Sequence, residues 1–158
     1  MLRFTNKPLQ RINVRFMSTF NAEAAANKLQ LGFKTPGILE QALTHRSYLH
    51  GNTANNDRLQ ILGAQVVRLT ITDAGVKSLG INAAKNELNN YVKKYTNPTQ
   101  LAERFDTLGL NEGLRYTAGT GSIPSGIKAK AFESLVGAIC HDKGTKAAQE
   151  FVSAHLLK

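Results

Sequence analysis

One long apolar stripe, between residues 57 and 76, constrains the fold of this chain more than any other feature. The polar segment Asn55-Asn56-Asp57 precedes it and supplies side chains of the kind that begin helices. Most apolar residues then recur three or four positions apart, the spacing of one helix face; they are Leu59, Leu62, Val66, Leu69 and Val76. Ile61, Val67 and Ile71 widen the stripe. The sequence therefore predicts a central helix that is buried on more than one side.

Start and stop signals divide the rest of the chain into further helices. Starts are indicated at Thr35-Pro36, Asn82, Asn97-Pro98 and Thr145, and stops at Gly32, Gly109 and Gly144. We expect helices over 22–31, 36–45, 82–95, 98–108 and 127–143, followed by a last one. Residues 113–126 are rich in glycine and predict a mobile loop. No β pattern is present, so the expected fold class is all-α.

Three blocks of the sequence carry a resemblance to a known family. Residues 42–48 read Ala-Leu-Thr-His-Arg-Ser-Tyr, residues 56–64 read Asn-Asp-Arg-Leu-Gln-Ile-Leu-Gly-Ala, and residues 129–139 read Ala-Lys-Ala-Phe-Glu-Ser-Leu-Val-Gly-Ala-Ile. In this order they resemble the signature of the ribonuclease III family, whose second block reads Asn-Glu-Arg-Leu-Glu-Phe-Leu-Gly-Asp. The resemblance runs from about Ile38 to about Lys143. It implies a ribonuclease III-like helical domain, which we place at residues 21–158.

The resemblance also implies a metal site whose residues are changed here. In the family four carboxylates from two helices hold the catalytic magnesium, and their positions correspond to Gln60, Ala64, Lys130 and Glu133. Only Glu133 is a carboxylate, Ala64 offers no ligand, and Lys130 places an ammonium where an anion belonged. We therefore expect no metal, no other cofactor and no nuclease activity. We also expect Lys130 to pair with Glu133 three residues on.

The first 20 residues resemble a mitochondrial presequence. They contain no acid, and their basic residues recur every four positions along one helix face: Arg3, Lys7, Arg11 and Arg15. We predict residues 1–20 to be a transit peptide and the protein to be located in the mitochondrial matrix. The alternative is a basic arm that stays on the protein and contacts RNA.

The charge of the chain suits a polyanionic partner. The net charge is +9, and without the four basic residues of the first segment the remainder still has 16 basic against 11 acidic residues. Lys85, Lys93 and Lys94 are our candidate RNA contacts, because 85 and 93 are about two helical turns apart and 94 is adjacent. The alternative is an ordinary solvated helix face. No apolar run is long enough to span a membrane.

Two further positions have competing interpretations. In the family, an aromatic residue at the position of Ile61 plugs a socket on a partner subunit, so Ile61 predicts a partner interface. Because Ile61 is smaller than the aromatic residue, a homodimer would contain two undersized plugs. Pairing with a partner that keeps the aromatic residue leaves only one, which favours a heterodimer. The alternative is an ordinary core residue. We interpret His45 as a hydrogen-bonded structural residue, because no nucleophile lies near it in sequence.

The combination of presequence, altered metal site and basic surface resembles the ribonuclease III-like proteins of the fungal mitochondrial ribosomal large subunit. This resemblance implies a structural ribosomal protein that binds ribosomal RNA, pairs with a second ribonuclease III-like subunit and touches other large-subunit proteins. Two alternatives stay open: a mitochondrial RNA-processing nuclease subunit using Glu133 and Asp57 with a partner's carboxylates, and a non-ribosomal pseudoenzyme scaffold. The family's enzymes often carry a C-terminal RNA-binding domain, for which we expect no room here.

Overall fold

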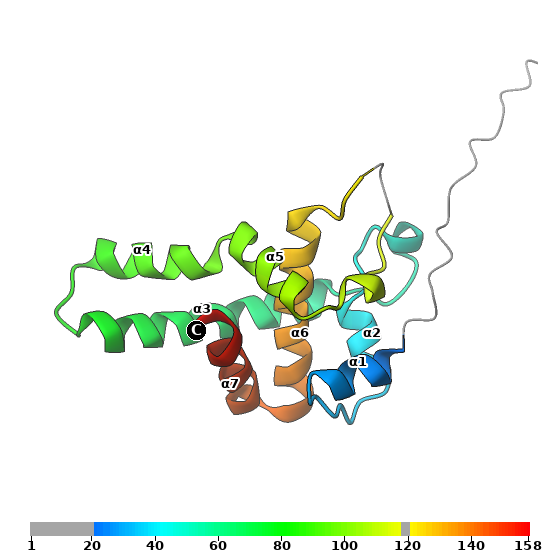
Figure 1. Ribbon diagram of the computed structural model, residues 1–158, viewed down its shortest axis with the longest axis horizontal. Helices are drawn as coiled ribbons and strands as arrows, with labels where there is room; N and C mark the ends of the chain where they lie inside the picture. Colours follow the sequence, from blue (N-terminus) through cyan, green and yellow to red (C-terminus); the bar gives the residue numbers. More distant parts are fainter. Residues whose placement is uncertain (1–20, 118–120) are drawn as a thin grey trace, which may run out of the picture.

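The protein folds into helices throughout the residues that its computed structural model describes, 21–117 and 121–158 (Figure 1). An isolated bridge between Thr44 and Arg115 is the one β contact in these ranges. The all-α fold class is thereby confirmed. The elements in chain order are α1 (Ala22–Lys28), α2 (Ile38–Ala42), the 3-10 helix η1 (Tyr48–Gly51), α3 (Asp57–Leu79), α4 (Lys85–Thr96), α5 (Pro98–Thr107), the 3-10 helix η2 (Asn111–Gly113), α6 (Ser125–Lys143) and α7 (Thr145–Leu156).

The crossing of α3 and α6 is the centre of the fold, and two glycines make it possible. A Cβ placed on Gly63 would lie 1.7 Å from the backbone oxygen of Glu133, and one on Gly137 would lie 2.0 Å from the backbone oxygen of Leu59. The two helix backbones are therefore in direct contact, closer than any side chain would allow. In Figure 1 α6 runs steeply across the long, nearly horizontal α3.

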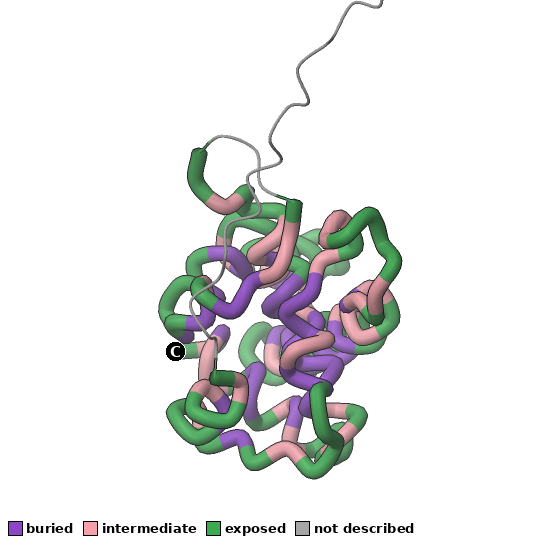
Figure 2. Tube along the Cα trace, turned by 90° about the vertical axis from the view of Figure 1, so that its right-hand side faces the viewer, coloured by how far each residue is buried: buried purple, intermediate pink, exposed green. Residues whose placement is uncertain are grey.

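The core surrounds this crossing. The largest fully buried side chains come from α3, α5, α6 and α7 and from the segments after α2 and α5, among them Leu43, Ile71, Phe105, Leu110, Phe132 and Leu135. The buried trace in Figure 2 accordingly runs through the middle of the molecule, with exposed chain around it. Nine of the 19 residues of α6 are buried, so this helix is covered on almost every side.

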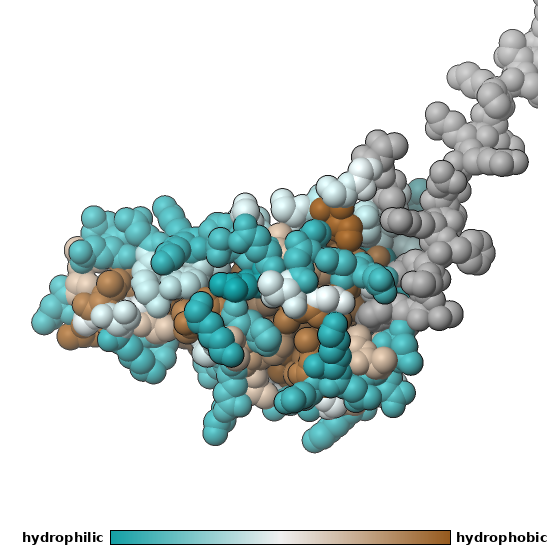
Figure 3. Space-filling view, viewed as in Figure 1, coloured by the Kyte–Doolittle hydropathy of each residue, from teal (hydrophilic) through white to brown (hydrophobic). Residues whose placement is uncertain are grey.

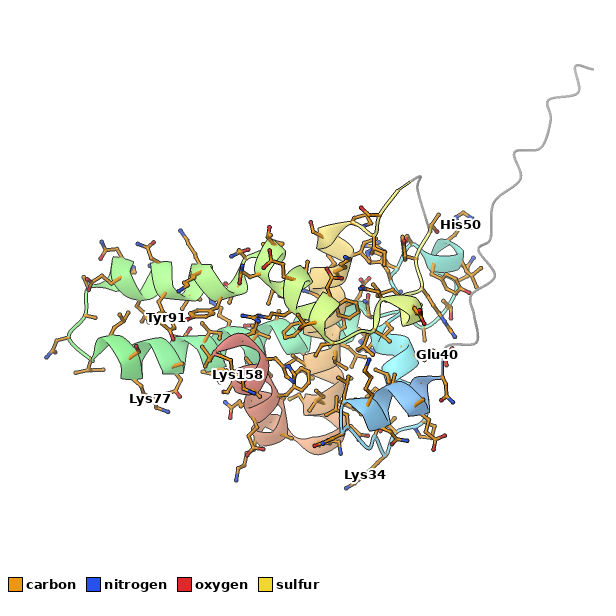
Figure 4. All side chains as sticks on the ribbon, viewed as in Figure 1. Lys34, Glu40, His50, Lys77, Tyr91 and Lys158 are labelled. Atoms are coloured by element: carbon orange, nitrogen blue, oxygen red, sulfur yellow. The ribbon has the colours of Figure 1, made fainter. Side chains whose placement is uncertain are left out.

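A helical hairpin of α3 and α4 extends away from the core (Figure 1). Gly75 on α3 lies against Leu88 and Tyr91 of α4, because a Cβ there would meet their side chains at 2.7 and 2.8 Å. Figure 4 shows Tyr91 directed from α4 toward α3. At the tip Ile81 is 83% exposed, and Figure 3 shows apolar surface at that end of the hairpin.

Most helix boundaries follow the local signals in the sequence. Asn97 caps α5 by accepting a hydrogen bond from Gln100 N, with Pro98 in the first turn, and α5 ends two residues before Gly109. Gly144 ends α6 in a left-handed conformation, φ 92°. The loop predicted over 113–126 is too long at both ends, because Gly113 belongs to η2 and α6 already starts at Ser125. Residues 118–120 of this loop lie outside the described residues. Thr145 is the first residue of α7, and Gly144 occupies the cap position.

Two predicted starts are wrong. The helix expected from Pro36 begins only at Ile38, because Gly37 has a positive φ of 73°, outside the right-handed helical region. The backbone N–H groups of Lys34 and Thr35, just before this turn, donate to Asp142 at the far end of α6. Asn82 does not cap α4. Instead Glu87 accepts a hydrogen bond from the backbone N–H of Ala84, at 2.9 Å, and α4 begins at residue 85.

Residues 1–20 lie outside the described residues, so the transit peptide and the mitochondrial location stay predictions. Among the helices that are described, none has the length and apolar character needed to cross a membrane.

Candidate functional site

Two of the four positions that the resemblance assigned to magnesium meet near the α3–α6 crossing. Gln60, near the start of α3, donates a hydrogen bond from Nε2 to Oε2 of Glu133 on α6 at 2.5 Å. Burial raises the pKa of Glu133, while this hydrogen bond and the positive charge of Lys130 oppose the rise. The carboxylate of Glu133 is thus held by a neutral amide from the facing helix.

The other two positions contribute no acid. Ala64 is half-buried on α3, and Lys130 is exposed on α6. The expected ion pair between Lys130 and Glu133 is not found: in the described part of the chain no carboxylate oxygen lies within 4.0 Å of Lys130 Nζ. Gln60 takes that place because it reaches Glu133 across the crossing. The charge of Lys130 still acts on its neighbours, since it opposes the rise in the pKa of Glu133 and contributes to the lowered pKa of His45.

This donor set does not fit a two-magnesium cage. Magnesium requires hard oxygen ligands in octahedral arrangement, and carboxylates are its usual protein ligands. The four side chains supply one carboxylate, one amide already bonded to it, one methyl group and one ammonium. Within 21–117 and 121–158, no group of three or more His, Cys, Asp or Glu side chains is arranged to hold a metal ion.

Asn56, whose tertiary contacts the sequence did not reveal, holds the start of α3 in place. Its buried side chain donates to the backbone oxygen of Ala42 at 3.2 Å, and its backbone N–H donates to Thr44 at 2.8 Å. Its own carbonyl accepts from Ser134 Oγ on α6 at 3.4 Å. Asn56 therefore connects α2, α3 and α6. We expected Asn56 or Asp57 to cap the helix; Asn56 occupies the cap position, but its side chain makes no capping hydrogen bond, and Asp57 is the first residue of α3.

His45 belongs to a hydrogen-bonded turn beside this site. Its Nδ1 accepts from the backbone N–H of Ser47 at 3.2 Å, and its backbone N–H donates to Arg115 at 2.8 Å. Burial lowers the pKa of His45, and the neighbouring charge of Lys130 lowers it further. The interpretation of His45 as a structural residue agrees with these bonds, although the side chain is only half-buried.

An apolar face of α3 is open to solvent. Ile61 is 62% exposed, Leu69 is 57% exposed and Leu62 is 39% exposed. Because Ile61 lies outside the core, the alternative of an ordinary core residue does not hold. Beside this face is a pocket of about 670 Å³ between α2 and the start of α3. Its lining includes Ile38, Gln41, Arg58, Leu59, Leu62 and Arg115.

The three candidate RNA-contacting lysines all lie on α4 and are all exposed. Lys85 is at its first residue, and Lys93 and Lys94 are in its last turn. At 100° per residue, Lys85 and Lys94 point to sides of the helix about 180° apart, so the three do not form one row. Lys94 Nζ lies over the ring of Tyr95, 5.2 Å from its centroid.

This all-α fold is similar to that of a solved nuclease domain. The nuclease domain of ribonuclease III from Campylobacter jejuni matches it with a TM-score of 0.73 and 22% identity, over 87% of this chain and 100% of that one. A second structure of that domain matches with a TM-score of 0.72 and 24% identity, over 87% and 94%. At such identities the likeness establishes the fold alone.

The family follows from the sequence itself. The model of the Ribonuclease-III-like family matches residues 35–158, so the chain belongs to this family. "Ribonuclease 3" of Methylococcus capsulatus is 32% identical over 136 residues, which are 82% of this chain and 56% of that protein. "Ribonuclease 3" of Desulforamulus reducens is 35% identical over 148 residues, 86% and 59% respectively. The chain thus spans little more than half the length of these curated relatives.

These relatives correct the functional prediction made from the sequence. We predicted a structural protein of the mitochondrial ribosomal large subunit that is not an enzyme, a pseudoenzyme of the family. The similar proteins are named Ribonuclease 3, and the structural neighbours are nuclease domains. They contradict the structural ribosomal role and favour the alternative, a nuclease subunit of the ribonuclease III family, over it. The physical reason for the error is that we inferred the role of the whole protein from one local cluster of donors.

Proposed function

We propose that this chain is a subunit of an RNA-processing nuclease of the ribonuclease III family, acting on double-stranded RNA as a dimer with a second ribonuclease III domain. The Gln60–Glu133 pair carries the proposal, because it keeps the two helices in contact at the family's metal site, while Gln60, Ala64 and Lys130 stand in place of three of the four acids. A chain with this donor set contributes to cleavage through a partner that has the missing carboxylates. The acid-free first segment supports a mitochondrial location for this work.

The exposed face of α3 supports the dimer. Ile61, Leu62 and Leu69 expose apolar surface that a partner would remove from water. The adjoining pocket of about 670 Å³ has room for a side chain of the partner. One of the Campylobacter jejuni structures is described as showing flexibility in a region involved in dimer formation of the nuclease domain. For this chain the dimer is part of the proposal.

The test is a cleavage assay on the chain alone, on a ribonuclease III protein that keeps all four carboxylates, and on their complex. With magnesium and duplex RNA, we expect the complex to cleave faster than that partner at equal concentration. We expect the chain alone to release no fragments. The substitution Glu133→Gln should leave cleavage by the complex unchanged, because the donor set around Glu133 does not form a metal cage.

Two results would count against this proposal. If the complex cleaves no faster than the partner, the chain is not a functional subunit of such a nuclease. If the chain cleaves RNA alone and Glu133→Gln abolishes that cleavage, the chain is a complete nuclease and needs no carboxylates from a partner.

A further inference from the structure

Lys130 lies at the altered metal site and carries a positive charge that has no carboxylate partner among the described residues. It is exposed near the start of α6, and no carboxylate of the described residues lies within 4.0 Å of its Nζ. Lys128, two residues earlier, is different, because its Nζ bonds Asp106 of α5 at 2.9 Å. About 200° separates the two lysines around the helix. One therefore serves the fold, and the other is available to a ligand.

The groups around Lys130 leave its charge in place. Gln60 holds the Glu133 carboxylate at 2.5 Å, so that this acid is turned toward α3. Asp57 lies near Arg46, with 3.9 Å between the charged atoms. His45 is close enough that the charge of Lys130 lowers its pKa, which favours the neutral ring. The local surface thus presents an ammonium, and the carboxylates of Glu133 and Asp57 already have other partners.

From this arrangement we infer that Lys130 binds a backbone phosphate of the RNA duplex, taking at this surface the place that a metal cation would take. The inference rests on the proposed function, in which the chain contacts double-stranded RNA. A divalent ion in a nuclease site neutralises the phosphodiester that it binds. An ammonium is a compact point charge with three donors, and it neutralises a phosphate without oxygen ligands from the protein. Ala64 beside Gln60 removes the acid that would repel that phosphate.

The inference makes RNA binding by this chain independent of magnesium. The full chain and a short, fully paired RNA duplex are the components of the assay, and affinity is measured over a range of salt concentrations. The wild-type chain should bind equally well in EDTA and in magnesium at matched ionic strength. Lys130→Gln should weaken binding by roughly threefold to tenfold and flatten the log–log salt dependence by about one unit. Lys130→Arg should keep wild-type affinity, and Lys130→Glu should lose more than Lys130→Gln.

Lys146→Gln is the matched control, because it removes the same charge from another exposed lysine at the start of α7, beyond the far end of α6. Equal affinities and salt slopes for Lys130→Gln and Lys146→Gln would overturn the inference, and so would a magnesium requirement for wild-type binding. In both cases the proposed function survives, because the wild-type chain still binds duplex RNA. If the wild-type chain binds no duplex RNA, the proposed function fails and the inference fails with it.

Discussion

At the scale of single residues, Asp142 shows how one carboxylate sets the path of a distant segment. From the last turn of α6 its two oxygens accept hydrogen bonds from Lys34 N and Thr35 N, at 2.8 and 2.7 Å. The Thr35 side chain as a hydrogen-bond donor, together with these two backbone bonds, holds the pKa of Asp142 below its ordinary value of 3.8. A carboxylate with a lowered pKa stabilises the fold above its unfolded-state pKa, and this stability is lost as the pH falls through the folded-state pKa.

Asp142→Ala should therefore lower the free energy of unfolding by about 1 kcal/mol at neutral pH, similar to the loss of a helix cap. The difference from wild type should shrink as the pH falls from 3.8 toward the lower folded-state pKa, below which Asp142 is protonated in both states. Urea denaturation at a series of pH values measures this difference in the free energy of unfolding. Asp73→Ala is the control. Because Asp73 forms an exposed ion pair with Lys77 on α3, its replacement should lower the free energy of unfolding by less. A pH-independent difference would contradict this assignment.

At the scale of elements, the fold depends on the contact between the backbones of α3 and α6. Gly63 and Gly137 have no space for a Cβ, and the atoms that block it are main-chain oxygens, which no rotamer change can move aside. Gly63→Ala or Gly137→Ala should each lower the free energy of unfolding by roughly 3 kcal/mol, because the helices must separate. Gly126→Ala, on α6 with nothing within 4 Å of the added Cβ, is the control and should be nearly neutral. Wild-type stability in Gly63→Ala would show that the crossing is looser than described.

The surface of α4 carries the prediction about electrostatic RNA binding. Replacing Lys93 and Lys94 by Gln should flatten the log–log salt dependence of RNA affinity by about one to two units, as expected for one or two lost phosphate contacts. The positions around the helix favour the lower figure, because neighbouring residues diverge by about 100°. Filter binding at several salt concentrations measures the slope. Lys77→Gln is the control, since Lys77 is paired with Asp73. An unchanged slope would place the RNA contacts on another element.

At the scale of the whole molecule, the exposed apolar face of α3 is the surface at which we expect a partner to bind. Ile61→Asp should abolish association with a second ribonuclease III domain, because it puts a charge into an apolar interface. The isolated domain should keep its helical content, since Ile61 is 62% exposed and supports no core packing. Ile81→Asp, at the hairpin tip, is the matched control and should leave association intact. Size-exclusion chromatography and circular dichroism give the two readouts. Continued association of Ile61→Asp would move the interface off α3.

The location of the protein in the cell is the second prediction at this scale. The basic, acid-free first segment predicts import into mitochondria. Replacing Arg11 and Arg15 by Glu should leave the protein in the cytosol, as followed by cell fractionation. Replacing Arg104 and Arg115, which lie in the helical domain, should leave import unaffected. Unchanged import of the Arg11 and Arg15 variant would favour an arm that contacts RNA.

Local rules were sufficient where an element's ends depend on its own residues. Asn97-Pro98 starts α5 and Gly144 ends α6, because capping and φ preferences act within a few residues. The spacing of apolar residues correctly predicts the long α3, and the three blocks correctly indicate the family, which matches residues 35–158. These features are properties of the sequence by itself.

Only the tertiary structure determines those features in which a residue and its interaction partner lie far apart in the sequence. Asp142 binds the backbone N–H of Lys34 from more than a hundred residues away, and Gln60 rather than Lys130 hydrogen-bonds the carboxylate of Glu133. The same apolar spacing that predicts α3 cannot tell that Ile61 faces solvent while Val67 is buried, since both widen the stripe. The physical reason is that hydrophobic spacing describes one helix, whereas burial and hydrogen-bond partners depend on which helices pack against it.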